Sequence, residues 1–257
     1  MRIATWNVNG LRARIDFMKL WLADRQPDVV GLQELKTPTD DFPHEEFEKL
    51  GYTTHVYGQK SWNGVAILSK LPMRHVISGL PGEEDWGSRL ITSVIEEKLE
   101  FTTVYCPNGK SVTHEDYPNK LRWYESLTRH WHNSDFPNRV ICGDFNIVPT
   151  AQDSWRGADA DGDVFHTDDE RQRLTALLDT GLIDFFRHKY PDSDAHSWWD
   201  YRGGSFHRRQ GLRIDFILGT PGLLDTLTEV AIDREYRKKQ DGLTASDHAP
   251  VYADLDL

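Results

Sequence analysis

Six short polar motifs interrupt the apolar runs of this chain, and their residue types suit chemistry on a phosphate group. Each motif ends or interrupts a stretch typical of a buried strand, where carboxylates and carboxamides are costly unless they are paired or bind a metal. Together they supply carboxylates, asparagines, one His and one Tyr, a donor set that suits a hard divalent cation and a phosphate. The motifs are WNVNG (6–10), LQE (32–34), YCPNG (105–109), GDFN (143–146), RID (213–215) and SDHAP (246–250).

The first two motifs predict a metal site. Glu34 follows the apolar run 29–32, and Asn7 and Asn9 place amide oxygens in a turn closed by Gly10. Mg²⁺ takes few protein oxygen ligands and keeps waters, which leaves room for a phosphate oxygen of a substrate. A lone Glu at a strand end is more commonly a cap or a surface ion pair, so this interpretation depends on the two asparagines.

Two further motifs predict groups that act on the phosphate. Asp144 and Asn146 are two residues apart, and the period of a strand puts both on one side. One of them can activate a water while the other donates to a phosphate oxygen. An Asx turn explains the same pair without catalysis. Tyr105 and Asn108 lie around a Pro-Asn-Gly turn and can bind phosphate, although a turn alone also explains Asn108.

The last motif predicts a charged histidine. Asp247 precedes His248 in a turn that enters the final strand, and a neighbouring carboxylate favours the imidazolium form. A cation suits the charge that develops on phosphate oxygens during hydrolysis. Asp215, inside the predicted strand 212–218, would be a costly buried charge unless paired. We therefore assign it to orient and charge His248.

The elements that must position these groups predict an α/β fold. Strands alternate with helices early and adjacent strand pairs also occur, a mixture typical of sheets covered by helices. Because the motifs run from Asn7 to His248, we expect one catalytic domain over residues 1–257. Residues 2–7 resemble 139–146, which is compatible with two similar halves packed face to face. The predicted strands are 2–7, 29–32, 64–68, 90–95, 99–105, 139–142, 212–218 and 251–255, and the predicted helices are 11–25, 42–50, 118–131 and 168–181.

The composition limits the possible partners and compartments. The 257 residues carry a formal net charge of −11, which argues against nucleic-acid binding unless a local basic patch exists. No signal-peptide pattern and no apolar run near the ~20 residues of a membrane span is present. Cys106 and Cys142 favour two buried thiols over a disulfide. We expect a cytoplasmic monomer that does not bind membranes.

One segment supplies such a basic patch. Between Arg202 and Arg213 there are four Arg, one His and no acid, and the pair Trp198-Trp199 comes just before. Aromatic residues among arginines on a Gly-rich loop suit a clamp on a nucleic-acid backbone beside an apolar pocket. A pair of core tryptophans is the alternative for the two Trp. The predicted contacts to substrate are Arg12, Trp198, Trp199, Arg202, Arg208 and Arg209.

Over nearly the whole chain, the motifs resemble those of the exonuclease III family of AP endonucleases, within the endonuclease/exonuclease/phosphatase superfamily. The stretch WNVNGLRA at 6–13 and LRID at 212–215 are specific to that family, whereas GDFN and SDH recur across the superfamily. The resemblance implies a four-layer α/β sandwich, in which two facing mixed sheets lie between helices. It also implies Mg²⁺- or Mn²⁺-dependent hydrolysis of phosphodiesters in damaged double-stranded DNA.

The resemblance also implies a role for each matching residue. It gives Asp144 as the group that activates water, with Asn146 beside it, and Asp215 with His248 as a dyad. The implied metal ligands are Glu34 with Asn7 or Asn9 and Asp247, in a group that also includes Asp144, Asn146 and His248. The implied phosphate contacts are Tyr105 and Asn108, and the implied walls of a pocket for a base-less sugar are Trp198, Trp199 and Leu212.

The implied reactions are cleavage 5′ to abasic sites and trimming of blocked 3′ ends, by phosphatase, phosphodiesterase or 3′→5′ exonuclease activity. One departure affects their balance. Members of the family often carry aromatic-x-Pro-x-Glu-Arg where this chain has HTDDER at 166–171, beside the acidic segment 153–170. If that segment faces DNA, incision within a duplex is weaker than trimming at 3′ ends. It does not match a calcium loop, because Val164 stands where that loop needs Gly.

Two alternatives remain open. The catalytic motifs alone also suit a superfamily phosphoesterase that acts on RNA, a nucleotide, an inositol phosphate or a phospholipid. A non-catalytic DNA-binding module with this fold is the second alternative. It ranks last because every key polar group is present in the sequence.

Overall fold

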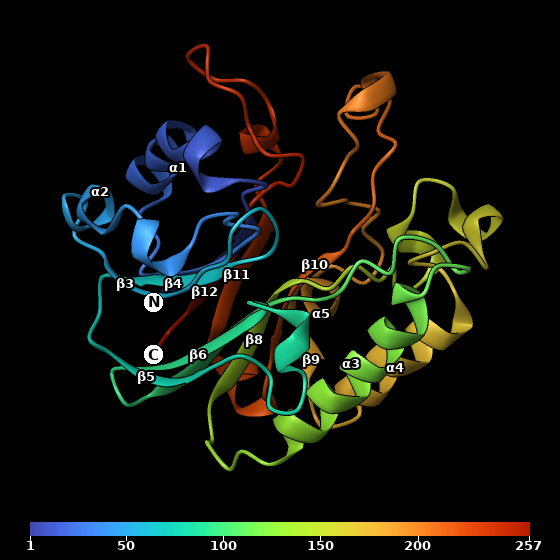
Figure 1. Cartoon of the computed structure of the whole chain (residues 1–257), viewed down its shortest axis with the longest axis horizontal. Helices are drawn as coiled ribbons and strands as arrows, with labels where there is room; N and C mark the ends of the chain where they lie inside the picture. Colours follow the sequence, from blue (N-terminus) through green and yellow to red (C-terminus); the bar gives the residue numbers. More distant parts are fainter.

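The computed structural model describes residues 1–257, and its twelve strands form two six-stranded mixed sheets that face each other (Figure 1). The first sheet has the order β11-β12-β1-β2-β4-β3 and the second β5-β6-β7-β8-β10-β9. The first contains β1 (Arg2–Asn7), β2 (Val29–Gln33), β3 (Thr53–Tyr57), β4 (Val65–Ser69), β11 (Leu227–Ile232) and β12 (Val251–Leu255). The second contains β5 (Met73–Ser78), β6 (Leu90–Ile95), β7 (Leu99–Tyr105), β8 (Arg139–Asp144), β9 (Ile183–Asp184) and β10 (Asp215–Gly219).

The two sheets share one strand arrangement. In each sheet a single central pair is parallel, β1 with β2 and β7 with β8, and the other pairs are antiparallel. Strand β1 therefore corresponds to β8, and its antiparallel neighbour β12 corresponds to β10. This correspondence confirms the interpretation of residues 2–7 and 139–146 as equivalent parts of two similar halves.

Helices cover the outer face of both sheets. Helices α1 (Leu11–Arg25) and α2 (His44–Glu48) cover the first sheet, and α3 (Asp116–His132) and α4 (Asp168–Leu178) cover the second (Figure 1). The short helix α5 (Phe185–Lys189) packs at the end of the sandwich beside β10 and β11. Helix, sheet, sheet and helix make four layers, so the predicted four-layer α/β sandwich is confirmed.

Alternation along the strands separates the layers. Ile3 of β1 lies in the core between the sheets, whereas Ala4 and Trp6 pack under α1 with Trp21. The two periodicities, two along a strand and 3.6 along a helix, bring these apolar faces together. Cys142 lies in the core between the sheets and Cys106 under α3, both as buried free thiols, as predicted.

Some predicted boundaries change. Strand β10 begins at Asp215, so this carboxylate lies at the strand entrance and not inside a strand that begins at residue 212. Helix α2 is five residues long and shorter than the predicted 42–50. The four edge strands β3, β5, β9 and β11 had not been predicted. No helix in the structure is both long enough and apolar enough to cross a membrane.

Candidate active site

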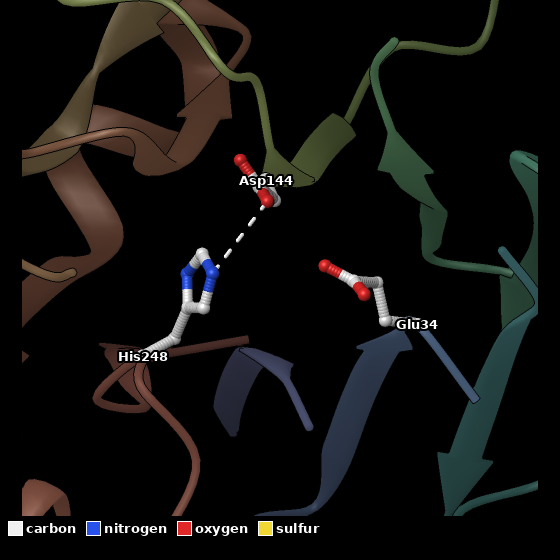
Figure 2. Close-up of side chains that lie close together, drawn as sticks. All are labelled: Glu34, Asp144 and His248. Carbon is white, nitrogen blue, oxygen red and sulfur yellow. Dashed lines mark ion pairs between the residues drawn. The ribbon is translucent and has the colours of Figure 1, made fainter. Parts of the chain in front are cut away.

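The predicted polar groups meet where the central strands of both sheets end. Asn7 is the last residue of β1, Glu34 follows β2, and Asp144 is the last residue of β8. Asp215 opens β10 directly opposite Asp144, because these two residues are partners in the antiparallel register. Figure 2 shows Glu34, Asp144 and His248 directed toward one another from three separate segments. Their ligand atoms all lie within 4.8 Å of one another.

A glycine fixes the position of Asp144. Gly143 has φ of +147°, and a Cβ added to it would lie 1.9 Å from the carbonyl oxygen of Val104 on the neighbouring strand. Only glycine lets β7 and β8 approach so closely at this point. The side chain of Asp144 is also held by a hydrogen bond, because its Oδ1 accepts from the backbone N–H of Asn146 at 2.9 Å.

Asn7 joins the two sheets at the site. Its Nδ2 donates to Glu34 Oε1 and to Asp144 Oδ2, both at 2.9 Å. Its Oδ1 is already engaged, since it accepts from the backbone N–H of Asn9 at 3.0 Å. In this arrangement Asn7 acts as a donor that orients two carboxylates, and its oxygen does not face them.

His248 forms a buried charged pair. Its Nδ1 lies 2.9 Å from Asp215 Oδ2, and Ser197 Oγ donates to the same oxygen at 2.6 Å. Burial opposes the charged ring, but Asp215, Asp144 and Asp247 outweigh it and raise the pKa of His248 to about 10. The ring is therefore an imidazolium at neutral pH, which suits a cation beside phosphate better than a metal ligand.

Asp144 has the properties of a general base. It is fully enclosed, and burial raises the pKa of its carboxyl while His248, with Nε2 at 3.8 Å, partly counters the rise. A carboxylate whose pKa moves toward neutrality accepts a proton from water more readily. Asp144 and His248 thus place a proton acceptor and a cation on neighbouring sides of one small space.

The same edge can hold a divalent cation. Glu34 is half-buried, and its Oε2 lies 2.9 Å from the ammonium of Lys36, which also donates to Asn9 Oδ1 at 2.6 Å. A cation thus already lies between two of the predicted oxygen ligands. Asp247 is next to them, because its Oδ1 accepts from Asn9 Nδ2 at 2.8 Å. Oxygen donors of this kind fit Mg²⁺ or Mn²⁺.

The predicted phosphate contacts lie on the second sheet's side of the site. Tyr105 ends β7 opposite Asp144, and burial together with Glu34 and Asp144 raises the pKa of its phenol well above the usual value. The phenol therefore stays a donor. Asn108 is exposed, and its Nδ2 donates to Asn146 Oδ1 at 3.4 Å. The Nδ2 group has a second proton that is free to bind a substrate.

An apolar cavity adjoins the charged groups. It measures about 390 Å³, and Trp198 and Leu212 form part of its wall together with Phe165 and His166. Trp198 also donates from Nε1 to Asp247 Oδ2 at 3.0 Å, which ties the cavity to the metal side. Trp199 does not line this cavity. Its side chain is 1% exposed and packs on Phe206, so the prediction of two tryptophan walls is corrected to one.

The predicted basic contacts divide into two groups. Arg12 and Arg202 are exposed and paired, with Asp41 at 3.1 Å and Asp200 at 2.7 Å. Arg208 and Arg209 have no carboxylate partner. They border a second cavity of about 660 Å³, whose lining also includes Arg234 and Trp155. Of the four predicted arginine contacts, Arg208 and Arg209 are therefore the ones without a carboxylate partner, and Arg12 and Arg202 are paired.

Three contributors had not been predicted. Lys36 bridges Glu34 and Asn9, Ser197 holds Asp215, and Trp6 donates from Nε1 to the carbonyl of His248 at 3.1 Å. Lys36 could have been predicted, because it is two residues after Glu34 and a half-buried carboxylate needs a nearby positive charge. For Ser197 no signal existed, because its partner is eighteen residues away in the sequence.

Comparisons with known proteins decide the family. Residues 4–248 match the model of the Endonuclease/Exonuclease/phosphatase family. The chain belongs to this family. Exodeoxyribonuclease III of Haemophilus influenzae is 36% identical over 99% of this chain and 100% of the relative, and an exodeoxyribonuclease of Bacillus subtilis is 33% identical over 98% of each.

Solved structures agree with the family assignment. A Neisseria 3′ phosphatase bound to a product DNA hairpin superposes with a TM-score of 0.95 at 36% identity, covering both chains completely. An AP endonuclease of Archaeoglobus fulgidus gives 0.94 at 32% identity, again over both whole chains. The predicted resemblance to exonuclease III is confirmed, and with it the class of enzyme, a phosphodiester hydrolase of DNA repair.

Proposed function

We propose that this enzyme hydrolyses phosphoester bonds at 3′ ends and at abasic sites of damaged double-stranded DNA, with Mg²⁺ or Mn²⁺ as cofactor. The observation that carries the proposal is the meeting of a buried base, Asp144, with a buried imidazolium, His248, beside the carboxylate Glu34. A base, a cation and a metal ligand around one space are what water attack on a phosphodiester requires.

The roles follow from the contacts. Asp144 Oδ2 accepts the proton of the attacking water, and Asn7 keeps that oxygen directed into the site. The charged ring of His248, held by Asp215, donates from Nε2 to a phosphate oxygen as negative charge develops. Tyr105 and Asn108 donate to the other oxygens of the phosphate.

Glu34, Asn9 and Asp247 would hold the metal, with Asp144 at its border. When bound, the ion supplies Lewis-acid polarisation of the phosphate and charge for the leaving oxygen. Lys36, which donates to Glu34 and Asn9, borders the same set of ligands. Asn7 and His248 are left outside the ligand set, because Asn7 donates to the carboxylates and His248 is charged.

One feature favours 3′ ends over abasic sites. His166 is 5% exposed, lines the apolar cavity with Trp198, and its Nε2 is 3.0 Å from Ser154 Oγ. An imidazole held there narrows the cavity that a base-less sugar would enter. We therefore place 3′-phosphate removal first and incision at an abasic site second among the activities of this enzyme.

A single assay tests the proposal. A labelled duplex with one abasic site is incubated beside the same duplex carrying a nick with a 3′-phosphate, each with Mg²⁺ or with EDTA. We expect Mg²⁺-dependent release of the 3′-phosphate and slower incision at the abasic site. The same incubations with p-nitrophenyl phosphate test the alternative, because hydrolysis of this small phosphoester with none of DNA would support a non-DNA phosphoesterase.

A further inference from the structure

A buried ion pair that the roles above do not use lies behind the site. Lys120 of α3 and Glu170 of α4 are both fully buried, and Lys120 Nζ lies 2.6 Å from Glu170 Oε1. A buried ion pair is costly to desolvate and is weak evidence of a contribution to stability. The Lys120–Glu170 pair lies between the two outer helices and the back of the site, so a role at the site is a better explanation for it than stability.

The ammonium of Lys120 holds the two turns that carry the phosphate-binding amides. Besides Glu170, its Nζ donates to the backbone carbonyl of Asn146 at 2.6 Å and to that of Asn108 at 3.2 Å. Three acceptors take all three protons of an ammonium, so the charged form is the one that fits. Burial lowers the pKa of Lys120, and Glu170 opposes that effect.

The two turns are joined to each other through Asn146. Its φ of +50° lies in the left-handed region, which asparagine adopts more readily than most residues other than glycine. Its side chain accepts from Asn108 and donates from Nδ2 to the carbonyl of Cys106 at 2.9 Å. A shift of either carbonyl away from Lys120 would therefore move both amide groups relative to Asp144.

Glu170 anchors the cation in turn. Its Oε2 accepts from the backbone N–H and the hydroxyl of Thr167 at 3.1 and 2.9 Å, in the capping box of α4. Thr167 Oγ1 also lies 2.6 Å from the phenol oxygen of Tyr117 on α3. Contacts within and between α3 and α4 thus fix the position of the ion pair. The ion pair in turn fixes the position of the two turns through their backbone carbonyls.

We propose that Lys120 is a positioning residue for the hydrolysis, which aims the amides of Asn108 and Asn146 at the substrate phosphate, with Glu170 as its anchor. The inference rests on the proposed function of the site. Lys120 touches no reacting atom; its effect reaches the phosphate through two backbone carbonyls. When the two amides are displaced, they lose contacts to the phosphate that strengthen in the transition state. We therefore expect a lower kcat and an unchanged KM.

The test is a double-mutant cycle on 3′-phosphate release by the full chain. We expect Lys120→Met to lower kcat at least tenfold with KM within twofold. In an Asn108→Ala/Asn146→Ala background the same substitution should cost less than twofold more, because neither of the two amides that Lys120 positions remains. In an Asn9→Ala background, on the other side of the site, its full effect should remain. Equal effects in both backgrounds, or a kcat within twofold of wild type, would overturn the proposal.

A matched control distinguishes an effect on the position of the amides from an effect on the stability of the fold. Arg139 opens β8 at the end opposite Asp144, and this buried cation donates from Nη1 to the carbonyls of Trp131 and Ser134. Arg139→Met should lower the midpoint of unfolding while leaving kcat within twofold. Where Lys120→Met does not fold, Glu170→Gln keeps the volume, removes the anchoring charge, and enters the same cycle with an expected threefold loss.

A second readout needs no activity. The side-chain amide NMR signals of Asn108 and Asn146 should shift in Glu170→Gln and stay in place in Arg139→Met. If the wild-type enzyme released no phosphate from any DNA, the proposed function would be wrong while these signals still decided the positioning role. Unmoved amide signals in Glu170→Gln would refute that role.

Discussion

The chemical centre and the surrounding rim of this enzyme are built in different ways. At the centre Asn7, Asp144, Asp215 and His248 are buried, and each has at least one hydrogen-bond partner between 2.6 and 3.1 Å. At the rim the side chains stand free: Trp62 is 70% exposed and Trp155 48%, and Arg208 and Arg209 lack carboxylate partners. The centre is organised before substrate arrives, whereas the rim keeps side chains that can adapt to it. Substitutions at the centre should therefore lower turnover, and substitutions at the rim should change binding or the choice of substrate.

The strongest test of this contrast is Asp144→Asn. The amide keeps the shape but accepts no proton from water, so we expect turnover of a 3′-phosphate substrate to fall about a thousandfold or more. Binding of the same DNA, measured by fluorescence anisotropy, should stay within threefold. A variant that retained a tenth of wild-type turnover would show that another group is the base.

The next largest effect concerns the dyad. We expect His248→Gln to lower kcat about a hundredfold, since the amide lacks the positive charge that stabilises the phosphate oxygens. Because the pKa of His248 is raised to about 10, the wild-type ring keeps its charge through neutral pH and loses it as the pH rises through about 10. A pH–rate profile of the wild type should fall there, and the profile of His248→Gln should lack that fall.

The metal side should respond to ion concentration. With one carboxylate oxygen replaced by a weaker ligand, Glu34→Gln is expected to raise the Mg²⁺ concentration for half-maximal turnover about tenfold. Excess Mg²⁺ should restore much of the rate. An unchanged Mg²⁺ titration would remove Glu34 from the ligand set and leave it as a partner of Lys36 alone.

Substitutions in the apolar cavity beside Trp198 should change the choice of substrate and not the overall rate. His166→Gly opens the wall beside Trp198, so we expect incision at an abasic site to rise about threefold to tenfold relative to 3′-phosphate release, through better placement of the sugar. Ser154→Ala keeps the ring but removes its bond to Ser154, together with a 3.3 Å bond from the backbone N–H of Arg156, and serves as the smaller control. A constant ratio of the two activities in His166→Gly would show that the acidic segment, and not this ring, sets the preference.

The smallest expected effect concerns the arginines of the rim, where those without a carboxylate partner should contribute more to DNA binding than a paired one. Joint replacement of Arg208 and Arg209 by Ala should raise KM about fivefold and lower the slope of log KM against log salt, because each freed phosphate contact contributes about one unit to it. Arg202→Ala, whose guanidinium is already paired with Asp200, should change KM less than twofold. Equal effects of the two variants would mean that the ion pair to Asp200 opens on binding.

The sequence predicts the central strands well and the edges poorly. The strands 2–7, 99–105 and 251–255 occur as predicted, because each is an apolar run that the fold buries. The edge strands β3, β5, β9 and β11 lack such runs, since one side of each has no neighbouring strand and few of their residues are buried. Apolar periodicity is a record of burial, so it is weakest where burial is partial.

The site shows a similar division. Asp144, Asp215 and His248 could be predicted because their types are costly inside apolar runs, and the structure brings them together. Lys120 could not, since a lysine in a helix normally reaches solvent. Its role depends on which carbonyls and which carboxylate the fold brings near it, and no local pattern encodes that. The exclusion of Trp199 from the cavity has the same cause, because neighbouring tryptophans turned out to face different parts of the fold.

The path of the chain through the two sheets has a consequence for biosynthesis. The second sheet is built from one continuous stretch, residues 73–219, whereas the first is completed only when β12 pairs with β1, joining Arg2 to Asp254 across the whole chain. Strand β12 is synthesised after the other eleven strands, and Asp247 and His248 directly precede it. The nascent chain can therefore fold half of its layers while it has no complete means of cutting DNA. The catalytic set is completed only when the segment that carries Asp247 and His248 joins β1.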